Sequence, residues 1–327
     1  MASDRPTMSQ EQFNEFRAFS AQCGRDPLRV QGAGGNTSIK DQGSMWIKAS
    51  GTELADALDG DIFVEVDLAK AKAEALGAGD GTCKSAVVDP SVTLRPSIET
   101  TFHALLDWRV VAHTHSVNTL VHAISPQGIA ACAKKLDGLP FTIVPYRKPG
   151  RPLTNAILEG LAAQQQIFVL ANHGLIVAGD TVTEVASLME EVERRLQMPI
   201  VVPSQAAPGG APVGFQWFDN NPFMGSRRLV QFAQSGSFYP DHVVFLGPAL
   251  PPEPMDGAPA CMMDGAGLAI RTDASPAQRA MAGCLADVLM RLPDSWEPTP
   301  IGSDAEAELL DWDAEKYRQA LAKRNPK

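Results

Sequence analysis

The spacing of apolar residues along the chain predicts an alternation of helices and short strands. In residues 9–22, phenylalanines recur at helical spacing, which predicts an opening helix. Compact runs rich in branched and aromatic residues are typical of buried strands. Such runs predict strands at 45–48, 62–66, 108–115 and 141–144, and two more within 167–178. Helices are predicted at 97–106, 118–124, 154–164 and 183–196, the first with Ser97 as its N-cap and the last with amphipathic spacing.

The order of these elements indicates the fold class. A glycine-rich segment at 32–38 and a small, polar, proline-containing segment at 77–96 are expected to be loops. Strands and helices alternate irregularly, and short turns join adjacent strands. This favours an α/β fold in which a central mixed or antiparallel sheet is layered between helices, over a regular parallel array.

A change in composition predicts a boundary near residue 199. Residues 199–214 are rich in Pro, Gly, Ala and Ser, as linkers and domain edges are. We therefore expect one domain at 1–198 and an α-rich C-terminal extension at 199–327. In the extension, a turn is predicted at 240–242, a strand at 243–246 and helices within 276–323. The sequence is compatible with three roles for the extension: a lid, a linker or an oligomer contact.

The overall composition excludes several classes of protein. With 44% apolar and 20% charged residues, the chain is an ordinary globular sequence. Its formal charge of −10 argues against a nucleic-acid partner, and no apolar stretch reaches the length of a membrane span. The N-terminus lacks the apolar core of a secretory signal, and the five cysteines form no Cys-x-x-Cys pair. We expect a cytoplasmic protein without disulfides or a thiolate metal site.

Three histidines are the candidate metal ligands of the chain. His113 and His115 end an apolar strand-like run, and alternation on a strand places both side chains on one face. His173 follows the strand-like run 167–171, in the turn Asn172-His173-Gly174. Catalytic zinc usually has three protein ligands and one open position, so these imidazoles predict a zinc site. The alternative is that they are hydrogen-bonded core or surface histidines. For His103, His122 and His242 we expect a structural role.

Six segments carry a family resemblance. They are Gly35-Asn36-Thr37-Ser38, Lys48-Ala49-Ser50-Gly51, Pro96-Ser97-Ile98-Glu99, His113-Thr114-His115, Val144-Pro145-Tyr146 and Asn172-His173-Gly174. In order and spacing they resemble the class II aldolase/adducin family over residues 10–198. The resemblance is closest to the aldolase part of long bacterial aldolase/dehydrogenase proteins. No Gly-x-Gly-x-x-Gly loop of a dehydrogenase module follows in this chain.

The resemblance implies roles for five residues. His113, His115 and His173 match the ligands of Zn²⁺ or another divalent cation. Glu99 matches the catalytic carboxylate, a proton shuttle beside the metal, although an acid in the first turn of a helix is also favoured by the helix dipole. Tyr146 matches a tyrosine that serves a neighbouring subunit's site and protonates the leaving fragment; the alternative is a tyrosine of a surface turn.

The resemblance also implies the substrate-binding residues. Asn36, Ser50, Gly51 and Ser97 match positions that bind a phosphate group. Sugar-phosphate aldolases of this kind tend to have two serines before the catalytic acid, whereas this chain has Ser97-Ile98. A free sugar, or a sugar acid whose carboxylate meets Lys48, is therefore an alternative to a sugar phosphate.

Together these features predict an enzyme of carbohydrate metabolism. The expected activity is a zinc-dependent aldehyde-lyase that cleaves a ketose phosphate or a related hydroxy-keto compound through an enediolate. The alternatives are an epimerase, dehydratase or decarboxylase on the same site, or a non-catalytic adducin-like binding module, which is expected to lack the histidines. The expected assembly is a homotetramer, and the expected partner is a small sugar-type molecule.

Overall fold

Two compact units make up the computed structural model, which describes residues 8–162, 164–202, 209–218 and 226–324. The first unit comprises 1–114, 138–170 and 175–194, and the second comprises 115–137, 171–174 and 195–327. The boundary expected from the sequence, between a domain at 1–198 and an extension at 199–327, remains a prediction. Among the described residues, no helix is long and apolar enough to cross a bilayer.

A seven-stranded sheet forms the centre of the first unit, in the order β3-β2-β1-β4-β7-β6-β5. The strands are β1 Asn36–Asp41, β2 Ser44–Lys48, β3 Phe63–Asp67, β4 Val110–Thr114, β5 Phe141–Val144, β6 Ile167–Leu170 and β7 Gly174–Gly179. From β3 to β7 the printed pairings are antiparallel, whereas β5 pairs with β6 in parallel. The predicted mixed sheet is confirmed.

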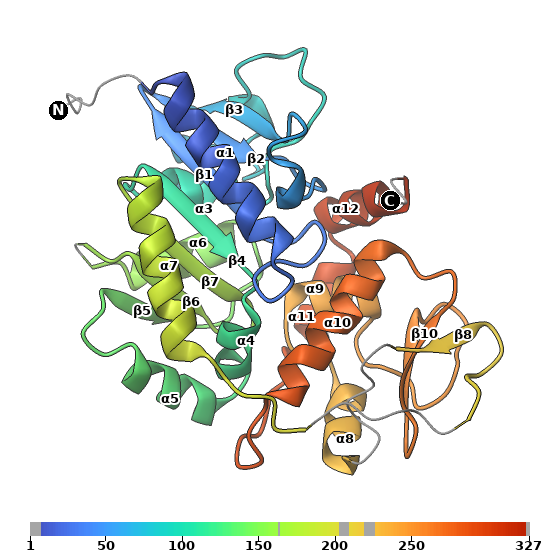
Figure 1. Ribbon diagram of the computed structural model, residues 1–327. Helices are drawn as coiled ribbons and strands as arrows, with labels where there is room; N and C mark the ends of the chain where they lie inside the picture. Colours follow the sequence, from blue (N-terminus) through green and yellow to red (C-terminus); the bar gives the residue numbers. More distant parts are fainter. Residues whose placement is uncertain (1–7, 163, 203–208, 219–225, 325–327) are drawn as a thin grey trace. The chain divides into compact units, whose positions relative to one another are not determined.

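Helices cover both faces of this sheet. Figure 1 shows α1 (Gln10–Arg25) and α7 (Val182–Leu196) in front of the sheet, with α3 (Thr100–Leu105) and α6 (Arg151–Glu159) behind it. The rear helices and strands share an apolar core of Phe102, Leu106, Val111, Val144, Leu153, Ala156, Ile157, Phe168, Leu170, Ile176 and Ala178. Shorter helical segments of this unit are α2 Leu68–Ala73, η1 Leu54–Asp56, η2 Glu74–Ala78 and η3 Lys84–Ala86.

The opening helix begins where its sequence specifies. The hydroxyl of Ser9 accepts from the backbone N–H of Gln12, and the Gln12 side chain accepts from the N–H of Ser9. This capping box satisfies two N–H groups that the helix cannot pair. The predicted helix over 9–22 is confirmed, and it continues to Arg25.

Helices dominate the second unit. They are α4 Val117–Ala123, α5 Pro126–Lys135, α8 Arg227–Ser235, α9 Pro240–Leu246, α10 Pro276–Met290, α11 Ser303–Leu310 and α12 Asp313–Arg324. The predicted α-rich character of the C-terminal part is confirmed. A small antiparallel sheet in the order β8-β10-β9 was not predicted; its strands are β8 Phe215–Trp217, β9 Ala260–Met263 and β10 Gly267–Arg271. Strand β8 has only three residues, and β9 and β10 contain few β-branched or aromatic residues, so β-propensity gave little signal.

The strand predicted at 243–246 is wrong, because these residues belong to helix α9. Tyr239 is extended, Pro240 occupies the first turn and Asp241 adds a first-turn acid, all of which favour a helix start. Every residue of α9 is buried. A short run that is apolar on all sides does not reveal from periodicity whether it is strand or helix.

The helix predicted at 97–106 begins later than expected. Helix α3 starts at Thr100, and its N-cap residue is Glu99 rather than Ser97. The Ser97 hydroxyl accepts from the N–H of Glu99, so it closes the turn that precedes the helix.

We predict that Phe168→Ala lowers the free energy of unfolding by about 3–5 kcal/mol, because the ring is 0% exposed in the core of the first unit. Urea titration followed by far-UV circular dichroism measures this change. Leu76→Ala is the control, since Leu76 is 72% exposed and its replacement should leave stability nearly unchanged. Equal effects of the two substitutions would contradict the assignment of this core.

Candidate metal centre

Strand β4 places the first histidine through its two neighbours in the sheet. His113 lies opposite Asn36 of β1 on one side and opposite Ile176 of β7 on the other. The run is apolar and buried throughout, so the ladder has one register that keeps these side chains inside. His115 follows one residue beyond the end of β4.

The turn before β7 places the third histidine. Because Thr114 pairs with Leu175, the residues just before β7 lie beside those just after β4. Asn172 has φ 53°, in the left-handed region that asparagine tolerates better than most residues. Its side-chain amide donates to the carbonyl oxygens of Phe238 and Thr299, both at 2.9 Å, which holds the turn in this conformation.

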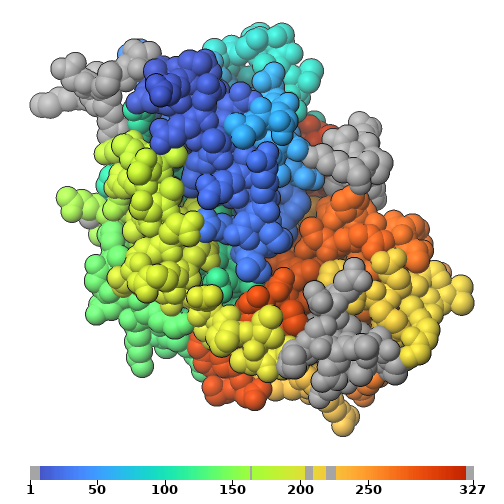
Figure 2. Space-filling model, in the orientation of Figure 1, coloured from blue at the N-terminus to red at the C-terminus, as the bar shows by residue number. Residues whose placement is uncertain are grey.

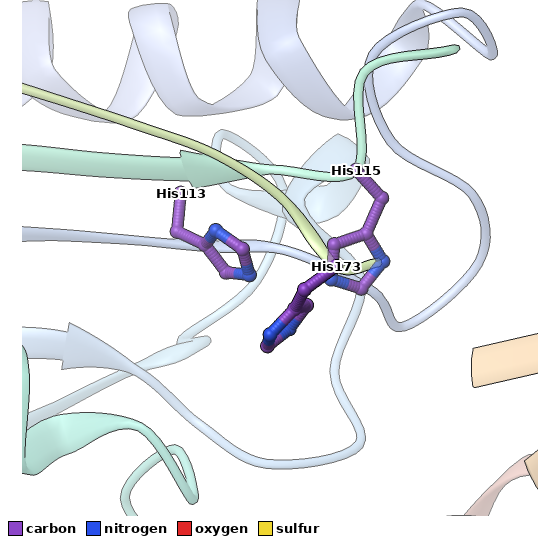
Figure 3. Close-up of side chains that lie close together, drawn as sticks. All are labelled: His113, His115 and His173. Carbon is purple, nitrogen blue, oxygen red and sulfur yellow. The ribbon is translucent and has the colours of Figure 1, made fainter. Parts of the chain in front are cut away.

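These segments bring His113, His115 and His173 together. One ring nitrogen from each lies within 4.8 Å of the others. Figure 3 shows the three rings grouped at the end of β4 and in the turn before β7. The three side chains are buried, at 0%, 5% and 4% exposure.

The chemistry of these nitrogens fits a divalent cation. His113 Nδ1 lies 3.0 Å from the carbonyl oxygen of Leu175. A carbonyl oxygen only accepts, so Nδ1 carries the hydrogen, and in the neutral ring Nε2 presents its lone pair. Metal-ligating histidines are usually held by such a contact on the other nitrogen. This buried triad could bind a metal ion, as the sequence predicted.

Glu99 lies beside the triad. Its Oε2 is 3.5 Å from His113 Nε2, and the side chain is buried. The same oxygen accepts a 2.8 Å hydrogen bond from the amide nitrogen of Asn36. The carboxylate is therefore held at one edge of the histidine cluster.

A buried chain of hydrogen bonds fixes the orientation of Asn36. Its Oδ1 lies 2.5 Å from His103 Nε2, and His103 Nδ1 lies 2.7 Å from the Ser38 hydroxyl. Since the amide nitrogen donates to Glu99, Oδ1 accepts from His103, and His103 Nδ1 in turn accepts from Ser38. Burial, and secondarily Lys40, hold the pKa of His103 well below its ordinary value, so the ring is neutral.

Sequence reasoning missed this connection, because it assigned His103 a structural role only. The available signal was the spacing: His103 follows Glu99 by four residues at the start of a helix, where such positions share a face. The structural role expected for His122 and His242 agrees with their packing. Burial lowers the pKa of His122 to about 4 and that of His242 to about 3, so both rings are neutral near pH 7.

Two adjacent loops bring together the predicted substrate-binding residues near Ser97. Ala49 and Pro96 form a β-bridge, and the backbone N–H of Ser97 donates to the Lys48 carbonyl. Gly51 has φ 80°, which closes the turn after Ser50. The buried Ser50 hydroxyl has no hydrogen-bond partner among the residues that the structure describes.

Lys48 and Asn36 have internal partners. Lys48 Nζ donates to the carbonyl oxygens of Ala33 and Thr52, at 2.9 and 2.7 Å, and so ties the glycine-rich loop to the turn that follows β2. Asn36 contacts Glu99, as described above. Both assignments to substrate binding therefore remain predictions.

Tyr146 lies two residues beyond the end of β5, a strand that is not a neighbour of β4 in the sheet. Strands β7 and β6 separate β5 from β4. Because β5 and β6 are parallel, Tyr146 follows its strand at the same edge of the sheet at which His173 follows β6. Its role at a neighbouring subunit's site remains a prediction.

Asp241 is a further polar residue that sequence reasoning did not single out. Its Oδ2 lies 3.2 Å from His115 Nδ1, and its side chain is 2% exposed. The sequence offered no signal for this contact, since Asp241 was expected in a turn far along the chain.

Curated relatives match only part of this chain. The uncharacterized oxidoreductase YuxG of Bacillus subtilis (strain 168) is 28% identical over 214 residues, which are 59% of this chain and 30% of that protein. The 3-oxo-tetronate 4-phosphate decarboxylase of Escherichia coli (strain K12) is 34% identical over 128 residues, or 33% of this chain and 57% of that protein. In both cases the chain spans less than two thirds of the relative's length.

A solved structure also resembles part of the chain. The N-terminal class II aldolase domain of a conserved protein from Thermoplasma acidophilum is 26% identical, with a TM-score of 0.49. The match covers 60% of this chain and 97% of that one.

The family model gives the broadest match. The model described as class II aldolase and adducin N-terminal domain matches residues 26–200, which are more than half of the chain. That range includes β1 to β7, the histidine triad and Glu99. The chain therefore belongs to the class II aldolase/adducin family.

Proposed function

We propose that this chain is a zinc-dependent aldehyde-lyase that cleaves a sugar-type hydroxy-keto compound. The observation that carries this proposal is the buried triad of His113, His115 and His173 with the Glu99 carboxylate 3.5 Å from one of its nitrogens. Three neutral imidazoles beside a carboxylate suit metal-assisted proton transfer. An adducin-like binding module has no need of such a buried donor set.

The bound cation would act as a Lewis acid on the carbonyl and adjacent hydroxyl oxygens of the substrate. Glu99 moves the proton that retro-aldol cleavage requires, between the substrate and its own Oε atoms. The amide of Asn36 keeps Oε2 directed toward His113. Tyr146, from a neighbouring subunit, exchanges a proton with the oxygen of the departing aldehyde: its phenol donates to the alkoxide in the condensing direction, and its oxygen receives that hydroxyl proton back when the C–C bond breaks.

The two loops around Ser97 are proposed to bind the polar end of the substrate. Ser50 contributes a buried hydroxyl, and Gly51 and Ser97 contribute backbone and hydroxyl groups. Asn36 contacts Glu99, which follows Ser97 by two residues. Lys48 supplies a positive charge behind them, which favours an anionic substrate such as a sugar phosphate or a sugar acid.

A decarboxylase is the second candidate, because the relatives named 3-oxo-tetronate 4-phosphate decarboxylase are 34% identical over 128 residues. Loss of carbon dioxide from a 3-oxo acid and retro-aldol cleavage both leave an electron pair on a carbon next to a carbonyl group, so one site suits either. Purified protein should be tested in parallel with ketose 1-phosphates for aldehyde release and with 3-oxo-tetronate 4-phosphate for carbon dioxide release. Aldehyde release supports the lyase, whereas carbon dioxide release alone supports the decarboxylase. An epimerase or dehydratase would produce neither.

We propose the organisation of the protein on the same grounds. Residues 1–198 would form the zinc domain and 199–327 an extension to it. A cytoplasmic homotetramer would allow Tyr146 to reach a neighbouring site, because closed symmetry repeats such a contact without forming filaments.

We predict that the purified protein carries about one zinc per chain. His113→Ala and His173→Ala should each abolish this stoichiometry, because each removes one of three buried nitrogen ligands. Atomic absorption on dialysed protein measures the zinc content. His122→Gln is the matched control, because it changes a buried histidine outside the triad and should retain the metal. Full zinc content in both triad variants would exclude the site.

We predict that Glu99→Gln retains zinc but loses about 10²–10⁴-fold in proton-transfer rate, since the amide is isosteric and has no titratable proton. Exchange of the substrate's α-proton in deuterated water, followed by NMR, measures the rate. Glu65→Gln serves as control, because Glu65 lies on β3 and binds Ser44 rather than the triad. An unchanged exchange rate in Glu99→Gln rules out its role as proton shuttle.

We predict that inactive Glu99→Gln and Tyr146→Phe chains regain activity when they are mixed into hybrid oligomers. If each site takes Tyr146 from a partner subunit, some hybrid sites contain both intact groups. Subunit exchange is monitored by native mass spectrometry, and activity is assayed on the exchanged sample. A monomeric protein, or verified hybrids that remain inactive, would exclude a shared site.

A further inference from the structure

A buried cluster of charged residues in the second unit borders the histidine triad. Asp241 is in the first turn of α9, and Glu315 and Arg318 lie on α12. All three are buried, and His115 of the triad touches the cluster through its Nδ1, 3.2 Å from Asp241 Oδ2. No residue of this cluster has a role in the proposed chemistry described above.

Arg318 holds the Asp241 carboxylate in place. Its Nη1 lies 3.0 Å from Asp241 Oδ1 and its Nη2 lies 3.3 Å from Oδ2. The same guanidinium donates to both carboxylate oxygens of Glu315, at 3.0 and 2.9 Å. A planar guanidinium that engages two carboxylates fixes both in position, so Asp241 meets His115 with little freedom.

The charge of Asp241 is maintained despite its burial. Arg318 lies within hydrogen-bond distance of both of its oxygens, and a guanidinium is always charged and only donates. Asp241 therefore meets this cation as a carboxylate, which accepts hydrogen bonds and does not donate them.

We propose that Asp241 is a positioning residue, which fixes the tautomer and ring orientation of His115 so that Nε2 binds the metal. The carboxylate requires hydrogen on Nδ1, which leaves the lone pair of the neutral ring on Nε2. In Figure 3 one nitrogen of His115 faces the other two imidazoles while the second faces away from them. The Leu175 carbonyl acts in the same manner on His113. The C-terminal part of the chain thus completes the metal site.

This inference rests on the proposed metal site, and its test separates the two. Metal-free protein is prepared by dialysis against a chelator, and its zinc affinity is measured by competition with a chromophoric chelator. Asp241→Asn should bind zinc about 10- to 100-fold more weakly than the wild type, as typical changes behind a ligating histidine do. Asp287→Asn is the matched control, since Asp287 also pairs with an arginine in this unit, at 2.6 Å from Arg291, and should keep wild-type affinity.

A double-mutant cycle distinguishes positioning from general stabilisation. In a His115→Ala background, whose weakened affinity is measured by titration with excess zinc rather than after dialysis, Asp241→Asn should cause no further loss, because the ring through which Asp241 acts is gone. Thermal melting of the metal-free variants shows whether each is folded. Wild-type zinc affinity in folded Asp241→Asn, or an equal loss with and without His115, would overturn the inference. A wild-type protein that binds no zinc would overturn the metal site itself.

A second measurement needs no variant at Asp241. The chain has six histidines, so ¹⁵N-labelled imidazoles of the metal-free wild type can be resolved by NMR and assigned to His115 by its replacement. In the neutral ring, the hydrogen on His115 should reside on Nδ1. A hydrogen on Nε2 would contradict the proposal even if Asp241→Asn failed to fold.

Discussion

The antiparallel ladder between β4 and β7 is the constraint on which the candidate site depends. It pairs His113 with Ile176 and Thr114 with Leu175, so the turn that carries His173 must reverse beside the end of β4. Both strands are buried along their whole length, and a slip of one residue would turn His113 to the opposite face of the sheet. The apolar sheet therefore does more than stabilise the fold. It sets the positions of imidazoles that come from separate parts of the sequence, and the next strand, β1, adds Asn36 opposite His113.

Around these histidines, hydrogen-bond partners fix the orientation of the polar groups. The Leu175 carbonyl accepts from His113, and the Asp241 carboxylate contacts His115. Asn36 donates to Glu99, so its side-chain oxygen accepts from His103. Each contact removes an alternative orientation, which is what a preorganised site requires. Buried polar groups are costly when they lack partners, so these chains of contacts also allow Glu99 and the imidazoles to lie in an otherwise apolar interior.

The sequence was informative where local patterns decide the structure. Alternation along 108–115 predicted which histidines share a face, and the run 141–144 matches β5 residue for residue. It was less informative where packing decides. Residues 243–246 are apolar on every side, and only their neighbours make them a helix. The N-cap of α3 is Glu99 rather than the expected Ser97, because the Ser97 hydroxyl bonds within the preceding turn. The contact of Asp241 with His115 depends on the packing of α9 and α12. The periodicity of the sequence does not predict that packing.

Anomalous diffraction tests the central claim most directly. Crystals of the purified protein would be measured on both sides of the zinc absorption edge. The account predicts one strong anomalous peak per chain, bonded to a nitrogen of each of His113, His115 and His173, with His115 bound through Nε2 and its Nδ1 facing Asp241. A peak at other residues, no peak in protein saturated with zinc, or a metal bound to His115 Nδ1 would contradict it.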